Sequence, residues 1–350
     1  MDLSETKHVK ITTIILSIIL SIIIALIPYY LLIHYVVDVD LQENNEELGR
    51  ANNLLNFYEQ PHDGDIFIIG TSLVNEGIDA YLVEDLLKEK HINRSVYVLG
   101  ENGDSPLERV TKLDNLIASK PGMVVIGLSY CSLTPDANDI YSDDRFLLRL
   151  QGKPINDKYK SLFSEEQLEP SYKTPLERFF DKRKFLFSSV DRYARDKLFK
   201  NEKSGRANNL SRYPKSYTSN FKDPWAHTIN KTETEKKEEL MDTKFRCPIS
   251  DDLDPQKKAL QYITTKLPQN NIKVMIINMP ISPYFSNVIS ESTRHNYSKF
   301  LNSTGVPWYD YEREYLSESF TDKWHLNVAG RTGFSPEIAA ILINLFMKGE

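Results

Sequence analysis

The chain has 350 residues, of which 41% are hydrophobic and 26% are charged, and its net charge is −6 at pH 7. This composition is typical of a globular protein with a sizeable core, and it argues against an intrinsically disordered chain. The mildly acidic balance argues against nucleic acid as a partner.

The first predicted element is a membrane-spanning helix at residues 11–37. The segment reads ITTIILSIILSIIIALIPYYLLIHYVV and contains no charged residue. About 20 apolar residues cross the hydrocarbon core of a bilayer, so this segment is long enough to span it. It is also longer than the apolar core of a cleaved signal peptide and lacks a small-residue cleavage site. We therefore expect a membrane anchor rather than a signal peptide or a buried core helix.

The charges on either side of this segment predict its orientation. Lys7 and Lys10 precede it, whereas five acidic residues follow it between positions 38 and 47. Because Lys and Arg favour the cytoplasmic side of a membrane, the N-terminus is predicted to be cytoplasmic and the rest extracytoplasmic. The predicted organisation is a cytoplasmic tail (1–10), the anchor, a linker (38–61) and one large domain (62–350).

Short apolar runs alternate with helical patterns in the large domain. Continuous runs of this kind are typical of strands that are buried on both faces of a sheet. They are DIFIIG at 65–70, SVYVLG at 95–100, MVVIGLS at 123–129 and IKVMIINMP at 272–280, with a weaker fifth, VPWYDYE, at 306–312. The alternation predicts a parallel sheet with helices on both faces.

Four segments between and after these runs have helical patterns. They are DAYLVEDLLKEKH at 79–91, SPLERVTKLDNLIASK at 105–120, DPQKKALQYITTKL at 254–267 and SPEIAAILINLFMK at 335–348. The second opens with a capping box of Ser105 and Glu108. In a parallel α/β sheet the ligand binds at the carboxyl ends of the strands, and Ser72 follows the first strand at that edge.

Residues 133–252 break the alternation and are predicted to be an insertion between the third and fourth strands. Within the insertion, residues 173–222 contain fourteen Lys or Arg against five Asp or Glu, a net charge of +9. Thr174 and Glu177 form a second capping box, which indicates a helix. Two interpretations remain open: a helix with a solvated basic face that packs on the core, or a surface segment that contacts an anionic membrane or polymer.

Two polar positions in the sequence TDKWHLN indicate acid–base chemistry. Asp322 and His325 are three residues apart, so within one turn their side chains can face the same way. A carboxylate that accepts the Nδ1–H of an imidazole directs Nε2 outward as a general base for a hydroxyl group. Ser72, in IIGTSLVNEGI, supplies a hydroxyl. The alternatives are structural: Ser72 as a helix cap, Asp322 as a helix-start residue and His325 as a hydrogen-bonded loop histidine.

The same segments resemble the conserved blocks of the SGNH/GDSL hydrolases over residues 62–132 and 271–347. IIGTSLVNEGI resembles the nucleophile block, YVLGENGDSPLERV the block with an oxyanion-binding glycine, and TDKWHLN the aspartate and histidine block. The resemblance implies a flavodoxin-like three-layer α/β/α sandwich. The triad that it implies is Ser72, Asp322 and His325, and the implied oxyanion donors are Ser72 and Gly103, with Gly100 as the fallback.

Two blocks depart from the family pattern. The usual G-D-S is G-T-S here, and the third block contains no Asn before Asn138, which leaves Ser129 or Ser132 as its candidate oxyanion donor. Loss of one such donor costs about 100- to 1000-fold in rate. A slow enzyme, a transferase with a different site and an inactive relative therefore all remain open.

The anchored arrangement resembles most the membrane-anchored branch that includes DltD-like and alginate O-acetylation proteins. It implies an acyl-ester hydrolase or O-acyltransferase that acts on a cell-surface glycan, polymer or lipid-linked substrate, with an integral-membrane acyltransferase as a candidate partner. The alternative is a catalytically weak or inactive module that binds a glycan or such a membrane partner.

No cofactor is expected from the sequence. The histidines are scattered without ligand spacing, so no metal site is predicted. The two cysteines, Cys131 and Cys247, can form one bond outside the cell or none, and the sequence leaves this open.

Overall fold

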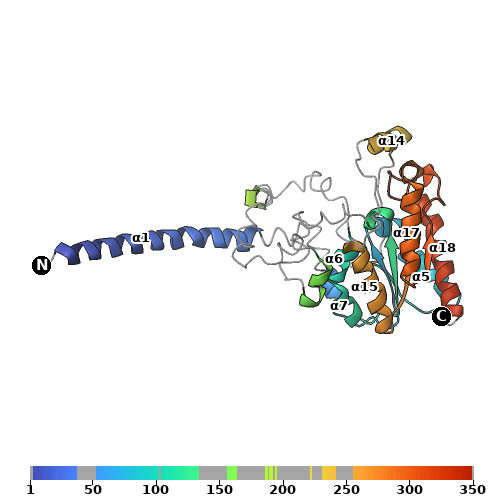
Figure 1. The fold of residues 1–350 in the computed structure, drawn as a ribbon, viewed down its shortest axis with the longest axis horizontal. Helices are drawn as coiled ribbons and strands as arrows, with labels where there is room; N and C mark the ends of the chain where they lie inside the picture. The colour runs from blue at the N-terminus through green and yellow to red at the C-terminus, as the bar shows by residue number, and fades with distance from the viewer. Residues whose placement is uncertain are drawn as a thin grey trace. The chain divides into compact units, whose positions relative to one another are not determined.

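The computed structural model describes residues 3–37, 53–101, 104–133, 156–163, 221–222, 231–241 and 255–348, together with six positions between 186 and 194. The chain divides into two compact units. One consists of Met1–Gly49 and Lys173–Asn208, and the other of Arg50–Tyr172 and Asn209–Glu350. The first unit contains the long apolar helix and the second contains the sheet (Figure 1).

The apolar helix α1 spans Leu3–Leu32 and continues into a short π-helix at Ile33–Val37. Within it, Thr13–Val37 is long enough and apolar enough to cross a membrane, with a mean hydropathy of 2.6. No residue in the most apolar 18-residue stretch of this helix is buried inside the protein. Among the described residues this is the one helix of its kind, and it coincides with the span predicted at 11–37. Its orientation in a membrane stays a prediction.

The second unit is built on a five-stranded parallel sheet with the strand order β2-β1-β3-β4-β5. The strands are β1 (Ile66–Gly70), β2 (Val96–Val98), β3 (Met123–Leu128), β4 (Lys273–Asn278) and β5 (Trp308–Asp310). Every residue of β1 and β3 is buried, which explains why these strands are continuous apolar runs rather than alternating ones. All five predicted strands are confirmed, and each is shorter than its apolar run.

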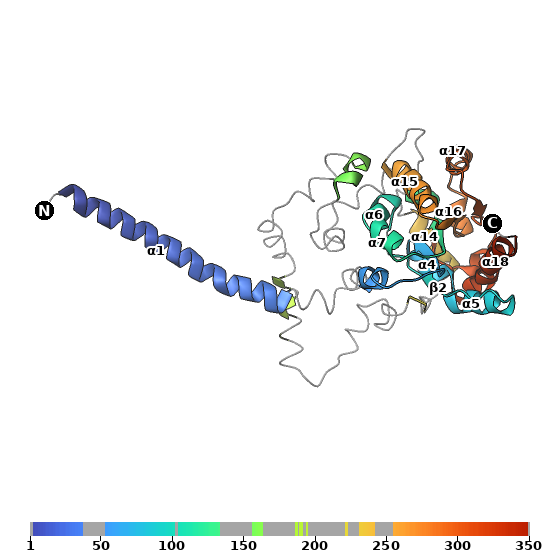
Figure 2. The same ribbon diagram turned by 90° about the horizontal axis from the view of Figure 1, so that it is seen from below.

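Helices cover both faces of this sheet, which gives the predicted three-layer α/β/α arrangement (Figures 1 and 2). The described helices of this unit include α4 (Ser72–Gly77), α5 (Ala80–Glu89), α6 (Pro106–Val110), α7 (Leu113–Ala118), α15 (Pro255–Gln269), α16 (Pro283–Ser286), α17 (Glu291–Ser303) and α18 (Val328–Met347), and α14 (Glu233–Met241) lies beyond the end of the sheet. Within the described residues, 3-10 turns lie at Tyr130–Leu133, Asp157–Leu162 and Ser317–Ser319. α5 packs against α18, and α6 packs against α15.

One predicted helix is divided in the structure. The pattern at 105–120 forms α6 and α7, with a turn between them at Thr111 and Lys112. In this turn the hydroxyl of Thr111 donates to the backbone oxygen of Glu108 at 2.7 Å. The start of α6 is as predicted, because the hydroxyl of Ser105 accepts the backbone N–H of Glu108.

Most of the predicted insertion at 133–252 lies outside the described residues, including the capping box of Thr174 and Glu177 and nearly all of the basic segment 173–222. Its described parts include the turn at Asp157–Leu162 and α14, which contacts α16. Cys131 is disulfide-bonded. Cys247, the other cysteine of the chain, lies in the part of the insertion outside the described residues.

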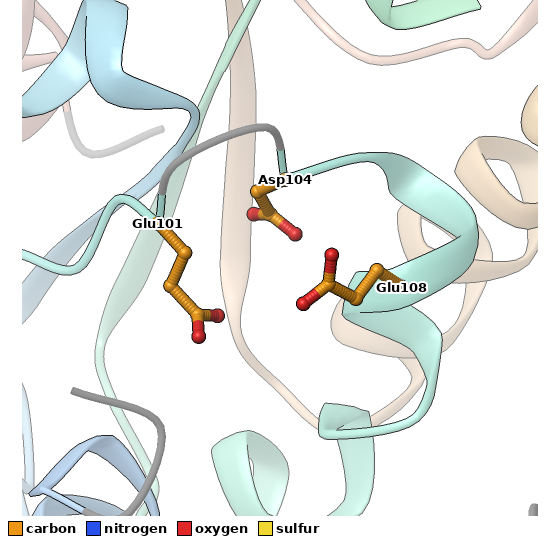
Figure 3. Close-up of side chains that lie close together, drawn as sticks. All are labelled: Glu101, Asp104 and Glu108. Atoms are coloured by element: carbon orange, nitrogen blue, oxygen red, sulfur yellow. The ribbon is translucent and has the colours of Figure 1, made fainter. Parts of the chain in front are cut away.

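A buried cluster of charged side chains surrounds the start of α6. Three carboxylates, those of Glu101, Asp104 and Glu108, have oxygens within 4.8 Å of one another (Figure 3). Lys112 Nζ lies 2.6 and 2.7 Å from the Glu101 oxygens and 3.4 Å from Glu108 Oε1. Arg109 donates to Asp104 through Nε at 2.9 Å and through Nη2. Arg109 and Lys112 therefore pair with these three carboxylates inside the protein.

We expect Lys112→Met to destabilise the fold strongly. The substitution keeps an apolar stem but removes the ammonium from between Glu101 and Glu108, and breaking a buried ion pair costs about 3–5 kcal/mol. The free energy of unfolding of the detergent-solubilised chain should fall by that amount in urea denaturation. Lys158→Met is the matched control, since its pair with Asp114 is about half exposed and should contribute less than about 1 kcal/mol. Equal losses in the two variants would contradict a structural role for the buried cluster.

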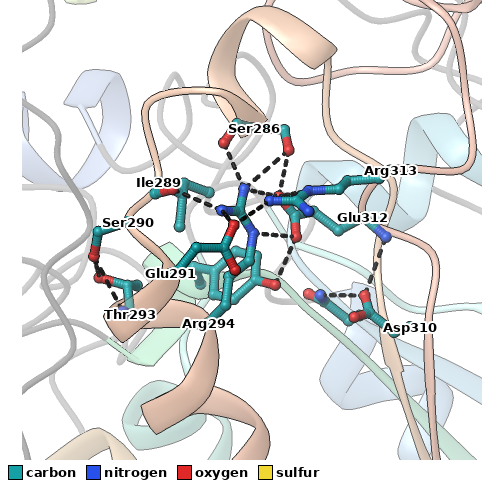
Figure 4. A network of polar contacts seen from close by, with 11 residues as sticks. Ser286, Ile289, Ser290, Glu291, Thr293, Arg294, Asp310, Glu312 and Arg313 are labelled. Atoms are coloured by element: carbon teal, nitrogen blue, oxygen red, sulfur yellow. Dashed lines mark hydrogen bonds and ion pairs between the residues drawn. The ribbon is translucent and has the colours of Figure 1, made fainter.

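A second buried network holds the segment that follows β5 (Figure 4). Glu312 accepts hydrogen bonds from Arg294 of α17 at 2.7 and 3.0 Å, from Tyr130 at 2.7 Å and from Ser286 of α16. Burial raises the pKa of Glu312, but these three donors outweigh burial and lower it below its ordinary value. The network ties this segment to α16, α17 and the turn after β3.

Candidate active site

Ser72 is the first residue of α4, directly after the turn that follows β1. Gly70, the last residue of β1, has a φ of +153°, and a Cβ there would lie 2.5 Å from the backbone oxygen of Gly127 on β3. Glycine is therefore required where the strand ends. The hydroxyl of Thr71 accepts the backbone N–H of Leu73 at 3.2 Å and caps α4. Ser72 is the first residue of the helix, so the capping role belongs to Thr71 and the Ser72 hydroxyl is available for other contacts.

Asp322 shapes the loop that precedes α18. Its Oδ1 accepts the backbone N–H groups of Trp324 at 2.7 Å and of His325 at 2.8 Å, which is the turn that a short acidic side chain favours. The last helix starts at Asn327, as its sequence position predicts, and not at Asp322: the Asn327 side chain accepts the backbone N–H of Gly330 at 3.0 Å. α18 consequently begins earlier than the segment predicted at 335–348.

The three residues of the predicted triad lie together. Ser72 Oγ is 2.9 Å from Nε2 of His325, although 253 positions separate the two residues in the chain. His325 Nδ1 is 2.9 Å from Oδ2 and 3.1 Å from Oδ1 of Asp322. Hydroxyl, imidazole and carboxylate thus form one chain of hydrogen bonds, which is the geometry of an activated serine nucleophile. The catalytic role of the three residues stays a prediction.

The electrostatics of the loop keep Asp322 charged. Burial raises its pKa, but the hydrogen bond and charge of His325 and the two backbone N–H groups lower it well below its ordinary value of 3.8. Asp322 therefore remains ionised at any pH at which an ordinary imidazole is neutral. By linkage it stabilises the fold at neutral pH, and this contribution is lost as the pH falls below its unfolded value toward its folded pKa.

The described residues include only some of the predicted oxyanion donors. Gly103 lies outside the described residues. At Gly100, the fallback, a Cβ would lie 2.6 Å from both Asn75 Oδ1 and the backbone oxygen of Thr71. Ser129 donates its backbone N–H to the hydroxyl of Ser132 at 3.1 Å, so this group is engaged within the turn after β3. The oxyanion assignments of Ser72, Gly103 and Ser129 stay predictions.

Sequence reasoning missed Glu76. This residue lies on α4, one turn beyond Ser72, and it is only 1% exposed. Its Oε1 is 3.7 Å from Nε2 of His325, the nitrogen that also contacts Ser72. Its spacing of four residues from Ser72 could have suggested it once Ser72 was assigned to the site, because such residues share a helix face.

A described part of the insertion contacts the loop that carries Asp322 and His325. The backbone N–H of Lys231, just before α14, donates to the backbone oxygen of Thr321 at 2.8 Å. Lys236 of α14 donates to the backbone oxygen of Ser317 at 3.0 Å. These described residues of the insertion therefore support the loop.

An aromatic pair flanks the histidine. Trp324 packs on Phe285 of α16, with ring centroids 4.0 Å apart and an interplanar angle of 44°. Phe285 is only 1% exposed, so the contact packs the loop that carries His325 against the core.

Comparisons with known proteins leave the chain without an assigned family. No family model matches it, and no curated protein matches it. Among solved structures, a catalytic mutant of an acetylxylan esterase from Geobacillus stearothermophilus is 11% identical, with coverage of 79% of this chain and 94% of that chain and a TM-score of 0.37. A GDSL-like lipase from Bacteroides thetaiotaomicron is 8% identical, with coverage of 85% and 100% and a TM-score of 0.36. Such low values carry no argument about activity, which depends on the geometry of the site itself.

Proposed function

We propose that this protein is a serine acyl-ester hydrolase or O-acyltransferase that α1 anchors to a membrane. The observation that carries the proposal is the 2.9 Å contact between Ser72 Oγ and His325 Nε2, with Asp322 bound to the other ring nitrogen. A capping serine or a hydrogen-bonded loop histidine does not need this chain of three groups. The chain of contacts is what a nucleophile, its base and the group that orients the base require.

The proposed reaction proceeds through an acyl-enzyme. Ser72 Oγ attacks the ester carbonyl carbon as His325 Nε2 takes the hydroxyl proton, and the carbonyl electron pair moves onto oxygen. When the tetrahedral intermediate collapses, the bond to the alcohol oxygen breaks and that oxygen takes the proton from Nε2. Asp322 holds the Nδ1–H and stabilises the imidazolium. Water or a second hydroxyl then attacks the acyl-enzyme by the reverse sequence, which gives hydrolysis or transfer.

The anchor favours a substrate at the membrane surface, because tethering raises the local concentration of a site near that surface. With Lys7 and Lys10 on the cytoplasmic side, the catalytic unit would face the outside of the membrane, where acylated glycans, polymers and lipid-linked sugars occur. An integral-membrane acyltransferase is the proposed partner. The resemblance to DltD-like and alginate O-acetylation proteins supports this assignment, and it remains a proposal.

A fluorophosphonate probe tests the chemistry directly, because it labels only an activated serine. We expect the detergent-solubilised wild-type chain to be labelled and Ser72→Ala to show no labelling. Ser303→Ala, which removes an exposed hydroxyl on α17, is the matched control and should label like the wild type. A well-folded wild type that stays unlabelled would favour the alternative function, an inactive module that binds a glycan or a membrane partner.

A further inference from the structure

Glu76 is a second carboxylate beside the imidazole of His325. α4 places Ser72 and Glu76 four residues apart, and both side chains reach the same ring nitrogen: the hydroxyl at 2.9 Å and Oε1 at 3.7 Å. Glu76 is 1% exposed, whereas the side chain of His325 is 17% exposed. Burial of a carboxylate is costly unless a cation or hydrogen-bond donors compensate it. A protonated imidazole at this distance is such a cation.

We propose that Glu76 is a positioning residue that stabilises the imidazolium of His325 during acyl transfer. The inference rests on the proposed function. When Ser72 Oγ attacks and its proton moves to Nε2, the new N–H carries positive charge between Ser72 and Glu76. The carboxylate lowers the energy of this state until the proton passes to the leaving alcohol oxygen. It acts through His325 and has no bond of its own to the substrate.

The other charges around this position do not reverse the effect. Asp322 contacts the opposite ring nitrogen and favours the same protonated state. Arg331 of α18 donates from Nη1 to the backbone oxygen of Glu76 at 3.5 Å, so its positive charge opposes Glu76 in part. β1, which also packs against α4, has no charged side chain. The imidazole thus lies between two carboxylates, one at each nitrogen.

The first test is the pH dependence of kcat/KM for p-nitrophenyl acetate in Glu76→Gln. Without the carboxylate the protonated imidazole is less stable, so the acid limb should move to lower pH by about one unit. The plateau should fall about tenfold, because the same charge stabilises the imidazolium that forms in the reaction. A role in packing alone would lower the rate without moving the limb, and that result would overturn the proposal.

The second test needs no turnover. The imidazole of His325 is titrated by NMR in full-length Ser72→Ala chain carrying ¹³C-labelled histidine, and its signal is identified by its loss in Ser72→Ala/His325→Ala. Adding Glu76→Gln should lower the midpoint by about one pH unit. Glu84→Gln, which neutralises another buried carboxylate on α5, is the matched control and should leave the midpoint unchanged.

The two tests separate this inference from the proposed function. If the wild type is inactive but Glu76→Gln still shifts the titration midpoint of His325, the proposed function is wrong while the interaction between Glu76 and His325 stands. If the wild type is active and Glu76→Gln leaves that midpoint unshifted, the proposed role of Glu76 is wrong. Glu76→Asp is the second variant if Glu76→Gln fails to fold. It moves the charge one methylene away from Nε2, so its midpoint should lie between those of Glu and Gln, and an unshifted midpoint overturns the role.

Discussion

Replacing His325 by alanine is expected to reduce kcat/KM for p-nitrophenyl acetate by about 10⁴- to 10⁶-fold while the fold is retained. Nε2 is the one base that the described residues place within a hydrogen bond of the Ser72 hydroxyl, at 2.9 Å. Without it the proton has no acceptor as the oxygen attacks, and the leaving alcohol has no donor. Stopped assays with purified chain measure the loss, and circular dichroism checks the fold.

The matched control for His325→Ala is His295→Ala. His295 is exposed on α17, and its removal should leave the rate within about twofold of the wild type, as surface substitutions rarely do more. If His325→Ala retained more than about one tenth of the wild-type rate, the histidine would have no place in the mechanism.

Asp322→Asn is expected to lower kcat by about 10⁴-fold without displacing the loop. An amide keeps one oxygen for the backbone N–H groups of Trp324 and His325, which now bind Oδ1. The NH₂ group of the amide, however, donates a hydrogen bond to Nδ1 of His325, whereas the carboxylate accepts one from it. The imidazole therefore adopts the wrong tautomer, in which Nε2 carries the hydrogen. The imidazolium also loses the negative charge that stabilises it.

The control for Asp322→Asn is Glu318→Gln, which removes one negative charge from the same loop at an exposed position. Its rate should stay near that of the wild type, since an exposed charge contributes little. The pH profile adds a second check on the wild type. Because the pKa of Asp322 lies well below its ordinary value, the acid limb should reflect the histidine, and a limb near pH 4 would point to the carboxylate instead.

The sheet and the order of its elements along the chain could be predicted because buried strands have a recognisable local sequence pattern. A strand covered on both faces, such as Met123–Leu128, is apolar at every position, and four such runs and a weaker fifth are visible in the sequence. Cap residues leave a pattern of the same kind, which is why Ser105 marks the start of α6. The division of the helix predicted at 105–120 was missed, since the apolar pattern runs through the turn at Thr111 and Lys112.

Only part of the candidate site could be predicted from local sequence patterns. Asp322 and His325 lie three residues apart, so their contact is local and their spacing predicts it. Ser72 was predicted from its place in a motif that follows a strand. Its contact with Nε2 of His325, however, depends on β1 ending at the same edge of the sheet as the loop before α18. Glu76 gave no sequence signal by itself, because a glutamate on a short helix is ordinary unless its partner is known.

The sequence by itself therefore determined the apolar helix, the five strands and the residue types available for chemistry, since hydrophobic pattern and local caps depend on near neighbours in the chain. Only the tertiary structure decided that Thr71 rather than Ser72 caps α4, that Ser72 and His325, 253 positions apart in the chain, form a 2.9 Å contact, and that a buried carboxylate lies 3.7 Å from the histidine. Such contacts arise from the register of packed elements, which the pattern of any one segment does not contain.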